Sequence, residues 1–242
     1  MTRLDVGVFA RPDWPDVPVY GRFEYLMDYL FWTGNEVVSY ARSMNLNVHD
    51  LKRDDATREK VEDELRGADP VFFFHASHGG DNILTGQGMS NLICCPGLHP
   101  CPEPNHEVLS DRVIYTLSCS SAKELGPAVI EANGISYIGY LPLLWIVVLE
   151  GDDVDAVFKD IWAGGAIALI DGKTTGEAYN WLRRRYEYWI SYWEMNPGWE
   201  APIMIWVLQA DLQNLKLLGK RDARIRSTQT RVESKIEEEV MS

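Results

Sequence analysis

Short apolar runs alternate along the chain with stretches in which apolar residues recur every three or four positions. A run of four to eight apolar residues is typical of a buried strand, and the three- to four-residue spacing is typical of an amphipathic helix. These patterns predict strands at 4–10, 46–51, 70–77, 111–120 and 135–141. Between them they predict helices at about 22–44, 56–69 and 121–133.

This order of strands and helices predicts an open α/β sandwich with a mostly parallel sheet. The third strand, in the run PVFFFHAS, is continuously apolar, as expected when helices cover both faces of a sheet. Ligands of such sheets bind outside the carboxyl ends of the strands. Residues that directly follow the third and fourth strands should therefore lie at one edge of the sheet.

The second half of the chain is mainly helical by the same criteria. Helices are predicted at 154–170 and 174–195, and a short late strand at 212–219, while the apolar run 203–209 receives no assignment. Because no internal repeat or Gly/Ser linker interrupts the chain, residues 1–219 are predicted to form a single domain. Residues 220–242 are first basic and then acidic, which predicts a charged tail that is a solvated helix or disordered.

Charge and hydropathy restrict the class of partner. The 242 residues include 23 Lys and Arg and 36 Asp and Glu, a net charge of −13, which argues against binding to nucleic acid. The most apolar stretch, 141–149, is shorter than the ~20 residues that a membrane span needs. The first residues, MTRLDVGVFARPDW, do not resemble a secretory signal, so a cytoplasmic protein is expected. A protein or peptide is the expected substrate, and a homo-oligomer remains open.

Two predicted strands end in residues that can carry out chemistry. His78 and Gly79 follow the third strand, and Cys119 follows the fourth, 41 positions after His78 (119 − 78 = 41). A Cys directly before a helix N-terminus lies in a field that favours the thiolate, and a neighbouring imidazole can hold the proton. Glycine lets the main chain approach a substrate carbonyl, so the Gly79 N–H can stabilise an oxyanion.

Structural roles are the alternative for each of these side chains. A Cys in an apolar strand is usually a small core residue, and a single His is more often structural than catalytic. His75 lies inside the strand and has no following glycine, which favours a hydrogen-bonded structural histidine. Ser77 is expected on the face opposite to His78 and is assigned a structural role.

The segments SHGG and VIYTLSCSSAKELGPAVIEANGISYIGY resemble the caspase-like clan of cysteine peptidases, and most closely the gingipain-type family. The resemblance is good over about 71–140 and looser at GEAYN (176–180) and LQNLKLLG (212–219). It implies a caspase-like three-layer α/β/α sandwich around a mostly parallel central sheet. It also implies that His78 is the general acid/base, that Cys119 is the nucleophile, and that the N–H groups of Gly79 and Cys119 form the oxyanion hole. Members of the clan often lack a third catalytic residue, and none is identified in this sequence. The signal peptide, long propeptide and adhesin modules of secreted gingipains are not expected here.

The resemblance also assigns a specificity pocket. One wall of this pocket in the clan comes from the chain just after the fifth strand, which here is GYLPLLWIVVLEGDD (139–153). Trp145 resembles an aromatic wall of the gingipain-type family, and Tyr140 and Ser120 are further candidate substrate contacts. The neighbouring apolar residues are Leu143, Leu144 and Ile146, and the acidic ones are Glu150, Asp152 and Asp153. An apolar and a basic preference therefore both remain open.

The loop ICCPGLHPCPEPNHE (93–107) contains enough ligands for a tetrahedral zinc site. These are Cys94, Cys95, His99, Cys101 and His106. Their spacing fits no standard zinc motif, and a disulfide such as Cys95–Cys101 or incidental thiols explain the loop at least as well, so no cofactor is expected. Part of the loop can lie near the site as a lid.

The segment GDNILTGQG (80–88) is rich in turn residues and is predicted to be a solvated loop. Cation binding through Asp81 and Asn82 is the alternative.

The favoured prediction is a cysteine endopeptidase that forms a thioester acyl-enzyme through a Cys119–His78 dyad. The alternative is a catalytically inactive caspase-like binding or regulatory module. A weaker third candidate is a zinc- or thiol-based redox module built on residues 94–106.

Overall fold

The structure, a computed structural model, describes residues 6–13, 24–147 and 152–225. The side chains of residues 6, 24–28 and 152–155 are also outside the described part. Glu150 and the side chains of Asp152 and Asp153, named above as the acidic residues after the fifth strand, lie outside the described part.

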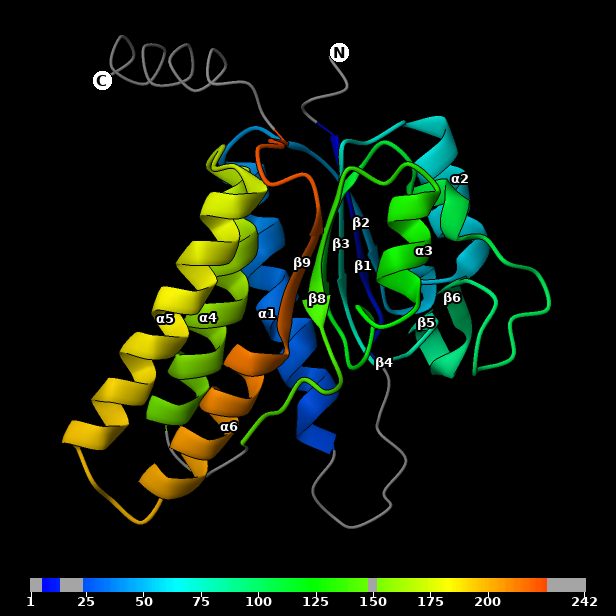
Figure 1. Cartoon of the computed structure of the whole chain (residues 1–242). Coiled ribbons are helices and arrows are strands. Elements are labelled where there is room, and N and C mark those ends of the chain that lie inside the picture. The colour runs from blue at the N-terminus through cyan, green and yellow to red at the C-terminus, as the bar shows by residue number, and fades with distance from the viewer. Residues whose placement is uncertain (1–5, 14–23, 148–151, 226–242) are drawn as a thin grey trace, which may run out of the picture.

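A six-stranded sheet in the order β2–β1–β3–β7–β8–β9 forms the centre of the molecule (Figure 1). Its parallel strands are β1 (Val6–Arg11), β2 (Asn47–Lys52), β3 (Phe72–Ala76), β7 (Val113–Leu117) and β8 (Ser136–Tyr140). Strand β9 (Leu215–Gly219) pairs antiparallel with β8. The mostly parallel sheet and its five predicted strands are confirmed. Every residue of β3, β7 and β8 is buried, because helices cover both faces.

Helices lie on both faces of this sheet (Figure 1). One face is covered by α1 (Glu24–Ser43), α4 (Asp152–Ile170), α5 (Thr175–Met195) and α6 (Ala201–Asn214), and the other by α2 (Arg58–Gly67) and α3 (Leu125–Glu131). Short 3₁₀ helices connect these elements, among them η2 (Arg53–Asp55), η3 (Gln87–Met89) and η4 (His106–Leu109). Two separate apolar cores correspond to the two faces. The arrangement agrees with a three-layer α/β/α fold.

A second, three-stranded antiparallel sheet lies beside α2 and α3. It consists of β4 (Gly79–Gly80), β5 (Ile83–Thr85) and β6 (Asn91–Cys94). The prediction of a solvated loop at 80–88 is therefore wrong. Leu84 of β5 and Leu92 and Ile93 of β6 are fully buried in the core on that face, and this burial stabilises a strand too short to be recognised in the sequence.

The end of the chain departs from the prediction in two places. Helix α6 continues to Asn214, so the late strand begins only at Leu215. Residues 220–225, expected in the charged tail, pack against the start of α5: the Thr175 N–H donates to the Ala223 carbonyl, and Ile225 is fully buried. Within the described residues, no helix has the length and apolar character needed to cross a membrane.

Candidate active site

The ends of β3 and β7 lie side by side at the lower edge of the sheet in Figure 1. Ala76 is level with Leu117, and the Ser77 N–H donates to the Leu117 carbonyl at 3.3 Å. His78 and Cys119 each lie two residues beyond the end of their strand, on the same edge of the sheet.

Gly79 passes directly against the chain that carries Cys119. A Cβ atom at Gly79 would lie 2.8 Å from the Ser118 Cβ and 3.0 Å from the Cys119 carbonyl oxygen, which is too close for any side chain. The Thr85 N–H donates to the His78 carbonyl, so Gly79 and Leu84 form a non-hydrogen-bonded pair of the β4–β5 hairpin. The Gly79 N–H therefore points away from β5, as an oxyanion donor must.

Just inside this edge of the sheet, His75 and Ser118 hold the two strand ends together. The buried His75 ring contacts the Ser118 hydroxyl through Nδ1 at 2.8 Å and the Thr85 carbonyl through Nε2 at 2.9 Å. The Ser118 hydroxyl also lies within donor distance of the Ser77 carbonyl. Burial lowers the pKa of His75 to about 4, so the ring is neutral and Nε2 carries the proton that the Thr85 carbonyl accepts. These contacts agree with the structural role predicted for His75. Ser77 is likewise buried, and its hydroxyl contacts that of Thr85.

The loop 141–147 packs over Cys119. The thiol donates to the Leu144 carbonyl at an Sγ–O distance of 3.6 Å, and the Ser120 hydroxyl donates to the Pro142 carbonyl. Ser120 adopts a positive φ of 54° and, in this arrangement, uses its hydroxyl to hold the loop and not to face a substrate. Part of the segment in which the pocket wall is predicted therefore lies beside Cys119.

Helix α6 fixes the position of this loop. The Trp145 N–H donates to Asp211 Oδ1 at 2.8 Å, and the Asn214 side chain donates to the Leu143 carbonyl at 2.8 Å. Asp211 is fully buried, and its Oδ2 has no hydrogen-bond partner within the described residues. Burial raises the pKa of Asp211 well above its usual range. Nothing in the sequence identified Asp211 beyond a single acidic residue inside the apolar run of α6.

Two expectations for this region are wrong. Tyr140 was assigned to substrate, but its side chain is fully buried and its hydroxyl lies 3.0 Å from that of Tyr186, because alternate residues of β8 face the helical layer. Cys119 was expected directly before a helix, yet α3 begins only at Leu125, after a series of turns. Burial raises the pKa of the Cys119 thiol. Burial therefore favours the thiol over the thiolate at Cys119.

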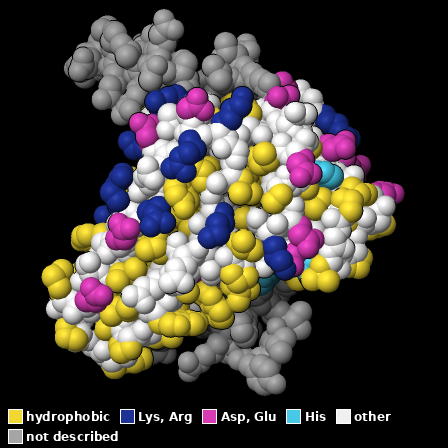
Figure 2. Space-filling model, in the orientation of Figure 1, with side chains coloured by type: hydrophobic (Ala, Val, Ile, Leu, Met, Phe, Trp, Pro, Cys, Tyr) yellow, Lys and Arg dark blue, Asp and Glu magenta, His cyan; other side chains and the backbone are white. Residues whose placement is uncertain are grey.

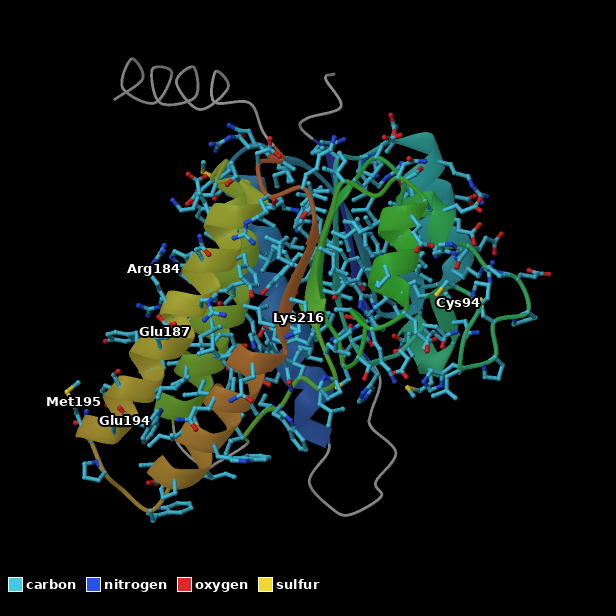
Figure 3. All side chains as sticks on the ribbon, in the orientation of Figure 1. Cys94, Arg184, Glu187, Glu194, Met195 and Lys216 are labelled. Carbon is cyan, nitrogen blue, oxygen red and sulfur yellow. A yellow bond between two sulfur atoms is a disulfide. The ribbon has the colours of Figure 1, made fainter. Side chains whose placement is uncertain are left out.

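The Cys/His-rich loop contains a disulfide between Cys94 and Cys101. The pairing suggested from the sequence, Cys95–Cys101, is wrong, because consecutive strand residues face opposite sides and Cys95 points into the core on the α2–α3 side. Cys94 lies across the central sheet from α5 and α6 (Figure 3).

The same loop is seated on the β4–β5 hairpin. Asn82 at the hairpin turn is buried, accepts from the His99 N–H at 2.8 Å and donates to the Cys95 carbonyl at 2.6 Å. The carboxylate of Asp81 forms an ion pair with Lys123. The alternative of a cation site at Asp81 and Asn82 is therefore not supported, because Asp81 is paired with Lys123 and the Asn82 amide is hydrogen-bonded to main-chain groups.

The disulfide also removes two of the five candidate zinc ligands. Among the residues that the structure describes, no group of three or more His, Cys, Asp or Glu side chains is arranged to hold a metal ion.

Neither the protein-family models nor the curated proteins that were searched give a match to the chain.

Proposed function

We propose that this chain is a cysteine endopeptidase of caspase-like fold, with Cys119 as nucleophile and His78 as general acid/base. The observation that carries the proposal is the close packing of Gly79, the residue after His78, against Ser118 and the Cys119 carbonyl oxygen, just beyond the carboxyl ends of the adjacent parallel strands β3 and β7. The proposal is supported by the nature of this edge of the sheet, because α/β proteins bind their ligands there.

Each residue has a defined step in this mechanism. His78 takes the Cys119 proton, and the thiolate adds to the peptide carbonyl carbon while the Gly79 and Cys119 N–H groups bind the oxyanion. His78 then donates its proton to the leaving amine as the C–N bond breaks, which leaves a thioester. Water, deprotonated by His78, hydrolyses the thioester and restores the thiol.

Labelling with a panel of peptide acyloxymethyl ketones, read by mass spectrometry, tests the nucleophile. We expect modification of Cys119, no modification of the buried Cys95, and none at all in Cys119→Ala.

His78→Ala should lower kcat/KM for a cleaved peptide by about 10²-fold or more. His49→Ala is the matched control, because His49 is a partly exposed histidine on β2 that pairs with Glu64. Equal rates for His78→Ala and His49→Ala would contradict the mechanism.

A catalytically inactive binding module is the second candidate. The observation that favours it is the hydrogen bond from the Cys119 thiol to the Leu144 carbonyl in a site where burial raises the thiol pKa. In that case Cys119 stays unlabelled by the whole panel and no peptide is cleaved.

The cellular location remains a prediction. Disulfides persist in oxidising compartments and are rare in the cytosol. The Cys94–Cys101 disulfide therefore favours an oxidising compartment, in contrast to the predicted cytoplasmic location. Alkylation of the protein directly on cell lysis, followed by mass spectrometry of these two cysteines, distinguishes them.

A further inference from the structure

A continuous strip of exposed apolar side chains runs from the loop over Cys119 onto α6. Its members are Leu143 (37% exposed), Trp145 (37%), Trp206 (52%) and Ile203 (42%). The Trp145 and Trp206 rings meet edge to face with centroids 5.3 Å apart, and Ile203 lies one helical turn before Trp206 on the same face. The space-filling view shows hydrophobic side chains gathered at the lower end of α5 and α6 (Figure 2).

This strip borders the candidate nucleophile. Trp145 follows Leu144, whose carbonyl accepts from the Cys119 thiol. Trp145 is fixed by its backbone bond to Asp211, so its ring is presented from an anchored loop. Leu143 is anchored in the same way through Asn214. Anchored aromatic side chains that remain exposed are typical of binding surfaces, because their burial by a ligand requires little further ordering.

The chemistry of the strip distinguishes between the apolar and basic preferences that the sequence left open. Asp211 is the acidic residue bonded to this wall, but its side chain is fully buried and beneath Trp145, so it offers no carboxylate to a bound cation. Burial also raises the pKa of Asp211, which disfavours the charged carboxylate. What the described wall presents to a ligand is aromatic and aliphatic surface.

We propose that Trp206 of α6 completes, with Trp145, a specificity wall that selects peptides with a large apolar or aromatic side chain next to the scissile bond. This inference rests on the proposed peptidase function for its location beside Cys119. It assigns a binding role to α6, which contains the apolar run 203–209 that has no predicted structure or function.

The test compares Trp206→Ala with Tyr188→Ala. Tyr188 lies on α5 with the same exposed fraction as Trp206, 52%, and is the matched control. Fluorogenic peptides that carry Phe, Leu, Ala, Lys or Asp before the cleaved bond are assayed with each protein. We expect the wild type to prefer Phe and Leu, and Trp206→Ala to lower kcat/KM for Phe peptides by about tenfold or more while changing Ala peptides by less than about threefold. Tyr188→Ala should leave the Phe/Ala ratio unchanged.

A preference for Lys, or an equal loss on Phe and Ala peptides in Trp206→Ala, would overturn the inference. Binding of the Phe and Lys peptides to Cys119→Ala, measured by calorimetry with and without Trp206→Ala, separates the two proposals. Trp206-dependent binding of the Phe peptide without cleavage by the wild type retains the wall and rejects the peptidase. If no peptide binds, the specificity wall is rejected. The wall is also rejected if the protein is a dimer that Trp206→Ala converts to a monomer without any effect on peptides, because a second copy of the chain would then cover this surface.

Discussion

Gly79 is the residue at which backbone geometry and the proposed chemistry meet most closely. Its Cα lies so near Ser118 and the Cys119 carbonyl that only glycine fits. The sequence predicts an oxyanion donor at Gly79, because glycine lets the main chain approach a substrate carbonyl. The structure adds a second steric reason for glycine, because a Cβ atom would meet the Ser118 side chain and the Cys119 carbonyl oxygen.

Gly79→Ala is therefore expected to destabilise the protein by about 1–3 kcal/mol and to slow labelling of Cys119. The added Cβ meets backbone oxygens of Cys119 and Ile83 and cannot be relieved by a side-chain rotation. Gly67→Ala is the matched control, because nothing lies within 4 Å of its added Cβ and alanine is the better helix former. Urea unfolding of both variants checks the prediction, and equal midpoints would contradict it.

At the scale of elements, the β4–β5 hairpin connects two segments that are separate in the sequence. Its turn at Asn82 holds the loop that contains His99, and the Asp81 carbonyl accepts from the N–H groups of Glu124 and Leu125 at the start of α3. The hairpin begins with the proposed oxyanion donor Gly79. The position of this donor thus depends on contacts from both the disulfide loop and the segment after Cys119.

The Cys94–Cys101 disulfide closes a loop with a sequence separation of 7. A cross-link of this length restricts the unfolded chain enough to stabilise the protein by about 2.5 kcal/mol. We expect reductant to lower the free energy of unfolding of the wild type by about this amount and to leave Cys101→Ser unaffected. Thermal unfolding with and without reductant provides the measurement.

Cys95→Ser distinguishes the pairing. It leaves the disulfide intact and should respond to reductant like the wild type, although burial of a hydroxyl lowers its stability under both conditions. A Cys95→Ser variant that no longer responds to reductant would instead show that Cys95 forms the cross-link.

For the whole molecule, the strands and helices that could be predicted from the sequence are those formed by long segments with a regular apolar spacing. The five parallel strands, and all α-helices of the described residues except α6, follow from apolar spacing that is read locally. The order of these elements also predicts that His78 and Cys119 lie just beyond strand ends on one edge of the sheet. The small sheet was missed because a three-residue strand such as Ile83–Thr85 has no period to recognise and is stabilised by tertiary burial. Tyr140 and Asp211 were beyond prediction for a related reason: whether an aromatic or acidic side chain faces solvent depends on which layer covers it.

Two buried titratable groups give the stability of the whole protein a specific pH dependence. His75 is neutral in the folded state, with a pKa of about 4, whereas an unfolded histidine has a pKa near 6.5. As pH falls from about 6.5 to about 4, the unfolded state binds a proton that the folded state excludes, so His75 should lower stability by about 3 kcal/mol over this range. His75→Gln should remove this loss, because glutamine can still donate to the Thr85 carbonyl and does not titrate.

Asp211 should act with the opposite sign. Its raised pKa means that the folded state keeps a proton that the unfolded state releases above about pH 4, so its contribution to stability falls as pH rises. Between about pH 4 and 6.5 the two groups oppose each other, and the wild type should show a flatter profile than either variant. Urea unfolding at several pH values should therefore give Asp211→Asn a steeper loss of stability on acidification than the wild type, and His75→Gln a steeper loss as pH rises. If Asp211→Asn keeps the wild-type profile, Asp211 is ionised in the folded protein, and the loop over Cys119 is then held by a buried carboxylate. If His75→Gln keeps it, the folded protein does not exclude the proton from His75.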